Sequence, residues 1–281
     1  MSDCINSSEV TLQCYVLSVA ILGPGLPNWN MAQSILSGEQ PYQRADFEIP
    51  PVTWLSATER RRVGKMVRLA LTVGRTAVQA AYVDAGKLAT VFTSSSGDGD
   101  NCDAIFTTLA ATEKSERFIS PTRFHNSVHN AAAGYWSIAN QCMMPSTSLC
   151  AYNASFAAGL MEACCQAMWT GEKILLISSD VMYPYPLSDI RPMGSNFAAA
   201  MVLNAVANDV TLAKLTLRCT TELETRIEIC ELDELRLSNP SARCLPLMQA
   251  IAKKTLHSDH ATPKKIRLEY VDSLSLEVEV D

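Results

Sequence analysis

The chain has 281 residues, 48% of them hydrophobic, so it can bury a substantial core as one large domain or two closely joined ones. Its net charge is −6, and it has no basic stripe with interleaved aromatic residues, which argues against nucleic acid as a partner. No apolar run reaches about 18 residues, and the N-terminus has no basic segment followed by an apolar one. We therefore expect neither a transmembrane span nor a secretory signal.

Ten cysteines are present, but none are spaced as C-x-x-C, and two of them, Cys164 and Cys165, are adjacent. This spacing predicts neither a zinc site nor a disulfide framework. A reducing cytoplasm is the compartment that fits best, and we expect no cofactor.

Residues 1–55 predict one strand, one helix and a long loop. The apolar run 16–22 leads into glycine and proline residues, as a buried strand that ends in a turn does. Residues 29–36 then predict a short helix. Residues 37–55 contain three prolines and show neither helical nor strand periodicity, so we expect a covering loop.

A capping box at Ser56–Glu59 predicts the start of a helix that continues to about residue 82. Its first turns carry a basic cluster, although a helix N-terminus normally favours acidic side chains. The cluster is Arg60, Arg61, Arg62 and Lys65. It is either a solvated face of the helix or a docking patch for an acidic carrier protein.

Residues 87–93 predict the next strand. The serine, glycine and aspartate residues after it predict a turn, because the lysine of a phosphate-binding loop is missing. Residues 103–112 predict a helix with Ile105, Phe106 and Leu109 grouped on one side.

Two helices and a buried strand follow. Residues 130–141 predict an alanine-rich helix whose single glycine lets it pack close to a neighbouring backbone. Residues 155–169 predict an amphipathic helix that ends at Gly171, and residues 173–179 predict a strand buried on both faces.

His125 and His129, just before these helices, are four residues apart, as metal ligands on a helix can be. The glutamate of H-E-x-x-H and a third ligand are missing. We therefore expect structural histidines and no metal site.

The rest of the chain predicts a Tyr- and Pro-rich loop and a mixture of strands with one helix. The predicted strands are 197–206, 213–220, 226–229 and a long final strand 265–280, and the predicted helix is 240–254.

One set of residues resembles the β-ketoacyl synthases of the thiolase-like fold. It comprises Ser-Pro at 120–121, Asn130, Gly134, Pro-Ser at 145–146, Gly171 and the buried strand after it. Within this set, Asn130 and Gly134 are expected to have a structural role rather than a catalytic one. The resemblance implies a layered α/β/α/β/α fold with a ketosynthase-like half at 1–206. It also implies a shortened C-terminal half at 207–281 that completes the sheet.

In a ketosynthase a cysteine nucleophile lies between a strand and the following helix, where amide dipoles lower its pKa. By the resemblance this position falls on Asn153 or Ala154, and neither is a thiol. The nearest thiol, Cys150, is either a small buried hydrophobe or an alternative nucleophile. The two histidine motifs of a ketosynthase are also missing, and only His257 and His260 remain in the C-terminal part.

These losses are typical of a chain length factor, a non-catalytic ketosynthase homologue that pairs with an active ketosynthase and shapes its acyl tunnel. The segments 123–136 and 154–163 are most similar to the small ketosynthase-like subunits of bacterial aryl polyene pathways. The resemblance then implies an active ketosynthase as partner, an acyl carrier protein acting through the complex, and the strand before Cys150 as the edge that pairs. Ile105, Phe106 and Leu109 are either the floor of the tunnel or ordinary core.

Two other hypotheses remain open from the sequence. One is an acyltransferase or ketosynthase that uses Cys150 with His125 or His129 brought near as its base. The other is a scaffold unrelated to acyl chemistry, which predicts a stable monomer without an exposed apolar face.

Overall fold

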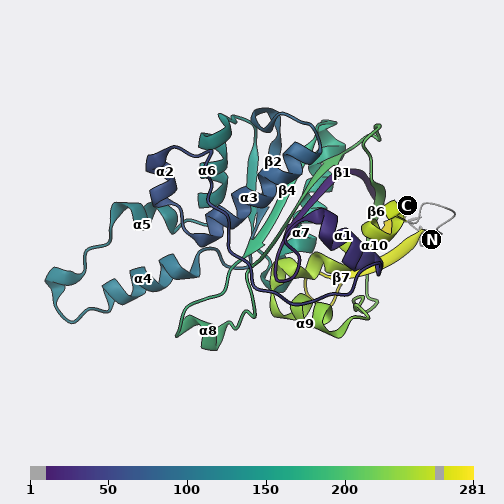
Figure 1. Cartoon of the computed structure of the whole chain (residues 1–281). Helices are drawn as coiled ribbons and strands as arrows, with labels where there is room; N and C mark the ends of the chain where they lie inside the picture. The colour runs from purple at the N-terminus through teal and green to yellow at the C-terminus, as the bar shows by residue number, and fades with distance from the viewer. Residues whose placement is uncertain (1–10, 257–262) are drawn as a thin grey trace, which may run out of the picture.

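The computed structural model describes residues 11–256 and 263–281. The strands of this part of the chain form one eight-stranded mixed sheet in the order β3-β2-β4-β5-β1-β6-β8-β7 (Figure 1). The strands are β1 (Leu12–Leu22), β2 (Ala89–Thr93), β3 (Ser146–Leu149), β4 (Ile174–Asp180), β5 (Phe197–Asn204), β6 (Ala213–Thr220), β7 (Lys264–Glu269) and β8 (Ser275–Val280).

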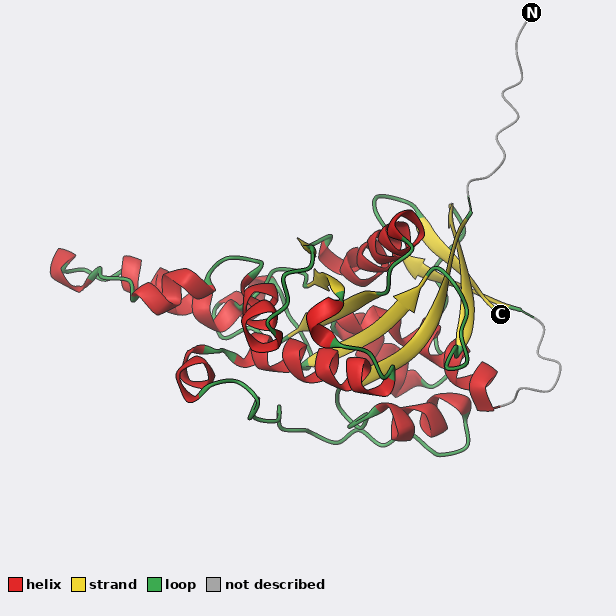
Figure 2. Ribbon diagram, turned by 90° about the horizontal axis from the view of Figure 1, so that it is seen from above, coloured by secondary structure: helices red, strands yellow, loops and turns green. Residues whose placement is uncertain are grey.

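Helices cover both faces of this sheet (Figure 2). The α-helices are α1 (Trp29–Ser37), α2 (Ala57–Arg62), α3 (Lys65–Ala80), α4 (Gly99–Leu109), α5 (Pro121–Asn126), α6 (Ala131–Asn140), α7 (Ser155–Thr170), α8 (Leu187–Ile190), α9 (Cys230–Ser238) and α10 (Leu245–Leu256). The 3₁₀ turns are η1 (Ala85–Lys87), η2 (Lys114–Glu116), η3 (Tyr152–Ala154) and η4 (Pro240–Cys244).

Each face of the sheet has its own hydrophobic core. Helices α3 and α6 bury one core, and α7, α1 and α10 bury the other. Gly159 of α7 lies so close to the sheet that a Cβ there would be 2.2 Å from the Cγ2 of Thr93, and Gly74 of α3 is equally crowded by Ile177. Glycine therefore sets how closely α7 and α3 approach the strands.

Most elements predicted for residues 11–206 are confirmed within a few residues. Helix α7 begins at Ser155 and ends at Gly171, which has the left-handed backbone of a C-terminal cap (φ 71°). Strand β4 is buried along its whole length, as a strand between two layers of helices must be. The α/β class and the thiolase-like architecture are confirmed.

The single helix predicted from 56 to 82 is wrong, because the chain breaks between α2 and α3 at Val63 and Gly64. Ser56 caps α2 as expected, accepting a hydrogen bond from the Glu59 amide at 3.2 Å. The break has tertiary causes. The side chain of Asn126 donates to the carbonyl of Arg62 at 2.7 Å, which ends α2. The carboxylate of Asp98 fills the space beside Gly64 that a Cβ would need.

The C-terminal part also differs from its prediction. Residues 226–229 form no strand; they lead into α9, which the sequence did not predict. The final strand predicted at 265–280 is a hairpin of β7 and β8, and the predicted helix 240–254 begins as η4 before α10. Strands β6, β8 and β7 extend the sheet beyond β1 instead of stacking a second sheet on it.

A buried carboxylate stabilises this C-terminal extension. Glu277 of β8 is 3% exposed, and its two oxygens accept hydrogen bonds from the Nε atoms of Arg218 (2.8 Å) and Arg267 (3.0 Å). Burial raises the pKa of Glu277, but the hydrogen bonds from both arginines outweigh it, so its pKa lies below the ordinary value. This group therefore stabilises the fold at neutral pH, and the stabilisation is lost as the pH falls through its lowered pKa.

We expect Glu277→Gln to lower the free energy of unfolding at pH 7 by about 1–3 kcal/mol, because two charge-assisted hydrogen bonds lose their anion. The difference from the unsubstituted chain should shrink as the pH is lowered toward about 3. Urea unfolding at several pH values measures both effects. Glu279→Gln is the control: its ion pair with Lys265 (3.6 Å) is exposed, and its loss should cost about 0.5 kcal/mol or less. Equal effects of the two substitutions would contradict this role of Glu277.

Candidate functional site

The carboxyl ends of four parallel strands meet at one edge of the sheet. Strands β2, β3 and β4 are parallel, and β5 runs antiparallel to both β4 and β1, so β1 shares their direction. Loops that follow such strands are where α/β proteins hold ligands. The residue predicted to replace a nucleophile lies at this edge, in the η3 turn between β3 and α7.

The η3 turn is sharp and tightly held. Tyr152 has a left-handed backbone (φ 52°), which is uncommon for a residue with a side chain. The buried hydroxyl of Ser155 donates to the Tyr152 carbonyl at 2.8 Å and accepts from the Ala151 amide at 3.0 Å. Asn153 is half-buried in this turn, and Ala154 is buried at the start of α7.

A cation covers the turn. The guanidinium of Arg191, which follows α8, lies 3.6 Å from the centre of the Tyr152 ring. Its Nη2 donates to the Asn153 side-chain oxygen at 2.8 Å. Arg191 thus occupies the hydrogen-bonding side of Asn153. Neither a carboxamide nor a methyl group can attack a thioester, so Asn153 and Ala154 supply no nucleophile here.

Cys150 lies one residue beyond β3 and is exposed, so the interpretation as a small buried hydrophobe is wrong. No hydrogen bond joins its thiol to an imidazole in residues 11–256 and 263–281. The ring of His129 lies 3.2 Å from the Ser94 carbonyl, and that of His125 packs edge-on against Tyr135. His257 and His260 lie outside the described residues.

A buried carboxylate joins three segments at the same edge of the sheet. Asp180, at the end of β4, is 1% exposed. It accepts hydrogen bonds from the hydroxyls of Ser94 (3.1 Å) and Ser241 (2.7 Å) and from the Ser95 amide (2.8 Å). Burial raises its pKa, although the three serines oppose the shift. Because Asp180 is enclosed, it cannot reach a substrate; it ties η4 to the loop after β2.

Sequence reasoning missed both Asp180 and Arg191. For Asp180 a signal was available: an acidic residue directly after a run of large aliphatics, at the end of a parallel strand. For Arg191 no local signal exists, because its partners lie about 40 positions earlier in the chain.

The three predicted tunnel residues lie on α4. This helix belongs to an arm of α4, η2 and α5 that projects from the body of the molecule (Figures 1 and 2). Ile105 is half-buried, whereas Phe106 is 56% and Leu109 48% exposed. Phe106 and Leu109 are thus not core residues of this chain. Phe118 and Phe124 of the same arm are also largely exposed.

Strand β3 is the edge strand that the sequence predicted. It pairs with β2 alone and has a free outer side. Apolar side chains are exposed around it, with Met143 just before β3 at 94% and Trp169 of α7 at 91%. The hydrogen bond from Gln166 to Thr147 (2.9 Å) places the exposed side of α7 beside this strand. An edge strand flanked by exposed methionine and tryptophan is typical of a protein interface.

The motif residues Asn130 and Gly134 begin α6. Asn130 is the N-terminal cap residue, but its side chain makes no capping hydrogen bond. A Cβ at Gly134 would have nothing within 4 Å. The close packing predicted for Gly134 therefore does not occur against any described residue of this chain.

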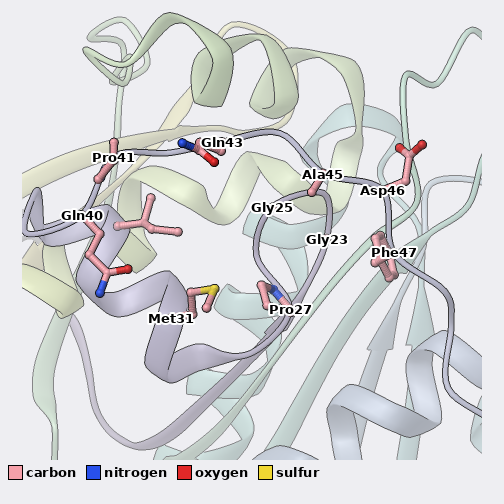
Figure 3. Close-up of a pocket in the computed structure, with 11 residues that line it drawn as sticks. Gly23, Gly25, Pro27, Met31, Gln40, Pro41, Gln43, Ala45, Asp46 and Phe47 are labelled. Carbon is pink, nitrogen blue, oxygen red and sulfur yellow. The ribbon is translucent and has the colours of Figure 1, made fainter.

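An open hollow of about 420 Å³ lies beside the turn after β1 (Figure 3). Met31 and Ile35 of α1 supply apolar lining. The segment that contains Gln43 and Asp46 runs along the side of the hollow opposite Met31 (Figure 3). Gly25 has a left-handed backbone (φ 67°), and a Cβ there would lie 2.3 Å from the Gln43 carbonyl oxygen. The segment can approach this closely only because residue 25 is glycine.

The described residues include no group of three His, Cys, Asp or Glu side chains placed to hold a metal ion. Among the helices at 11–256 and 263–281, none combines the length and the apolarity needed to cross a membrane.

Comparisons with known proteins identify relatives of this fold. The family described as "Beta-ketoacyl synthase, N-terminal domain" matches residues 35–260. No curated protein matches the chain significantly.

Several solved structures match almost the whole chain. The ketosynthase ApeO in complex with its chain length factor ApeC, from Xenorhabdus doucetiae, matches at TM-score 0.69 and 21% identity, over 95% of this chain and 99% of the matched one. The AntDE:AntF complex, a type II acyl carrier protein with its ketosynthase, matches at TM-score 0.72 and 12% identity, over 97% and 99%. The ishigamide ketosynthase/chain length factor matches at TM-score 0.69 and 12% identity, over 96% and 99%.

Proposed function

Because the chain belongs to the β-ketoacyl synthase family, we propose that it is a non-catalytic subunit of the chain-length-factor type. It pairs with an active ketosynthase and shapes the tunnel in which an acyl or polyene chain grows. One combination of features carries this proposal. The arm is apolar and exposed, the edge strand β3 is free, and the turn at the nucleophile position has no thiol.

The η3 turn supports a role without covalent catalysis. A nucleophile that attacks a thioester must be activated, either by a base within hydrogen-bond reach or by surroundings that lower its pKa. Asn153 is neither a thiol nor a hydroxyl, and Arg191 already occupies its side-chain oxygen. Cys150 is exposed but has no imidazole partner among the described residues. Its exposure makes Cys150 accessible, but no activating partner lies beside its thiol in residues 11–256 and 263–281, so we do not propose it as the nucleophile.

The pairing surface supports a ketosynthase partner. Ketosynthase-like subunits pair edge strands across a two-fold axis and bury large apolar areas. Strand β3 offers its free edge, and the arm residues Phe106, Leu109 and Phe124 offer apolar area that this chain alone leaves in water. The arm projects from the body of the molecule (Figure 1), where a second subunit would have room to cover it.

The mechanism of this subunit is passive. Cysteine and histidine side chains of the partner condense malonyl units that an acyl carrier protein delivers to the complex. Ile105, Phe106 and Leu109 form the end of the tunnel, where the growing chain meets a wall. Adding one methylene to a filled cavity costs about 1–3 kcal/mol. This cost favours the shorter of two adjacent product lengths by about one to two orders of magnitude.

An aryl polyene pathway is the setting that we propose for this complex. The segments 123–136 and 154–163 support it, because they are most similar to the small ketosynthase-like subunits of such pathways. So does the likeness in fold to a complex of a ketosynthase with its chain length factor. We further propose that the chain works in the cytoplasm and that residues 1–206 and 207–281 are its two structural halves.

Co-expression with an active ketosynthase tests this function. We expect the tagged chain to retain the ketosynthase through affinity and size-exclusion chromatography, and to be poorly soluble or to self-associate when expressed alone, because its apolar arm is then uncovered. A chain that is a stable monomer alone and retains no ketosynthase would contradict the proposal.

A further inference from the structure

The arm of α4, η2 and α5 leaves the sheet through a short connection. Residues 94–99, which we call the root of the arm, join the end of β2 to the first turn of α4 (Figure 1). Beyond the root, α4 packs chiefly against α5, which belongs to the same arm. The root therefore determines where α4 starts and in which direction it leaves the sheet.

The carboxylate of Asp180 holds the root from the inside of the molecule. Its Oδ1 accepts hydrogen bonds from the Ser94 hydroxyl at 3.1 Å and from the Ser95 amide at 2.8 Å. The Ser94 oxygen in turn accepts a hydrogen bond from the Gly97 amide at 3.0 Å. Gly97 has a left-handed backbone (φ 77°), so the chain turns sharply at this point. One carboxylate thus fixes the shape of the root from residue 94 to residue 97.

The ring of Tyr183 holds the first turn of α4. Tyr183 follows Asp180 by three residues, and a Cβ at Gly99 would lie 2.2 Å from its Cδ1. The helix can start this close to the ring only because residue 99 is glycine. Asp98 caps the same turn by accepting a hydrogen bond from the Asn101 amide at 3.1 Å. The end of β4 and the segment after it therefore fix the start of α4.

Neither Asp180 nor Tyr183 is placed to act on a substrate. Asp180 is 1% exposed and is surrounded by its own hydrogen-bond donors. Burial raises the pKa of Tyr183 to about 12, so its hydroxyl stays protonated at neutral pH and cannot serve as a base. Their contribution must come from the position that they give to other residues.

A small movement of the root is amplified along α4. Phe106 lies seven residues beyond Gly99, which corresponds to about 10 Å along an α-helix. A tilt of about 10° at the root therefore moves the helix at Phe106 by about 2 Å. This displacement is comparable to the length that one methylene group adds to an acyl chain.

We propose that Asp180 and Tyr183 are positioning residues that set the depth of the tunnel through the root of α4. The inference rests on the proposed function, because it takes Phe106 and Leu109 as the end of the tunnel. It adds that product length depends on two residues that never meet the product. A wall limits length sharply only when its position is fixed, and these two side chains fix it.

Two buried serines offer a matched test of Asp180. Ser94→Ala removes the hydroxyl on the root side of the carboxylate, and Ser241→Ala removes the hydroxyl on the η4 side, which lies 2.7 Å from Oδ2. Each variant takes one donor from the same buried carboxylate, so both should lower the melting temperature.

The two serine variants should differ in their products when each is assembled with the partner ketosynthase. Ser94→Ala should change the ratio of adjacent product lengths by about threefold or more, because the root loosens. Ser241→Ala should leave this ratio unchanged. If Asp180 only stabilises the fold, both variants have the same product distribution, and that result would overturn the proposal.

Gly99→Ala tests the contact with Tyr183 by displacing the root. The added methyl group forces the first turn of α4 away from the ring, so the product distribution should shift by a similar factor in complexes that still assemble. The proposal requires a change in both Ser94→Ala and Gly99→Ala. If Gly99→Ala does not assemble, the comparison of the two serine variants decides alone.

The outcome with Phe106→Ala separates this inference from the proposed function. Changed products in Phe106→Ala but unchanged products in Ser94→Ala and Gly99→Ala would refute the positioning role and leave the tunnel in place. Unchanged products in all three variants would refute both.

Discussion

Phe106→Ala and Leu109→Ala, each assembled with the partner ketosynthase, should give longer products or a broader range of product lengths. Both side chains project from α4 into space that this chain leaves open, and truncation deepens a tunnel that they end. Removing the penalty of about 1–3 kcal/mol for one extra methylene should change the ratio of adjacent product lengths by about five- to 150-fold. Liquid chromatography with mass spectrometry measures the distribution.

The matched control for this experiment is Thr107→Ala. Thr107 is exposed on the same helix, one residue from Phe106 and about 100° around the helix axis. We expect its product distribution to match that of the unsubstituted complex. Unchanged products from both Phe106→Ala and Leu109→Ala, in complexes that still assemble, would remove these residues from the tunnel.

Ser148→Pro should abolish assembly with the ketosynthase. The Thr90 amide donates to the Pro145 carbonyl, so in this parallel ladder the amides of Thr147 and Leu149 face β2 and that of Ser148 faces outward. Proline at 148 removes an amide that only a partner strand can use, and its ring obstructs that strand. The carbonyl of the partner strand is then left unpaired at a cost of about 1–3 kcal/mol, which alone corresponds to an affinity about five- to 150-fold weaker.

Co-purification and analytical ultracentrifugation measure this loss of assembly. Ser148→Val is the matched control, because it changes the side chain but keeps the outward amide; the complex should survive. Thermal unfolding of both variants shows whether the β2–β3 ladder is intact. If Ser148→Pro folds and still binds the ketosynthase with unchanged affinity, β3 is not the pairing edge.

The part of the fold that local patterns determine was predicted well. The buried run that forms β4, the period of α7 and the glycine that ends it are all properties of short segments. The break between α2 and α3 was missed because Asn126 and Asp98, more than 30 positions away, cause it. The hairpin of β7 and β8 was missed because the alternating pattern continues through its turn at Asp272.

The candidate site was predictable only in part. The sequence located the turn at Asn153 and Ala154 and the missing thiol, because these are positions along one segment. It could not place Arg191 over that turn or join Ser241 to Asp180, because distant segments meet only in the folded chain. It also suggested a buried Cys150, since burial of free cysteine is common, whereas the edge position of β3 leaves this thiol exposed.

In the proposed complex this chain shapes a product that another subunit makes. Intact-mass measurement of the purified complex, after incubation with an acyl thioester, tests it most directly. We expect an acyl adduct on the partner ketosynthase alone, and we expect Cys150→Ser to leave product yield and length unchanged. An acyl group covalently attached to Cys150 of this chain, together with loss of product in Cys150→Ser, would contradict it.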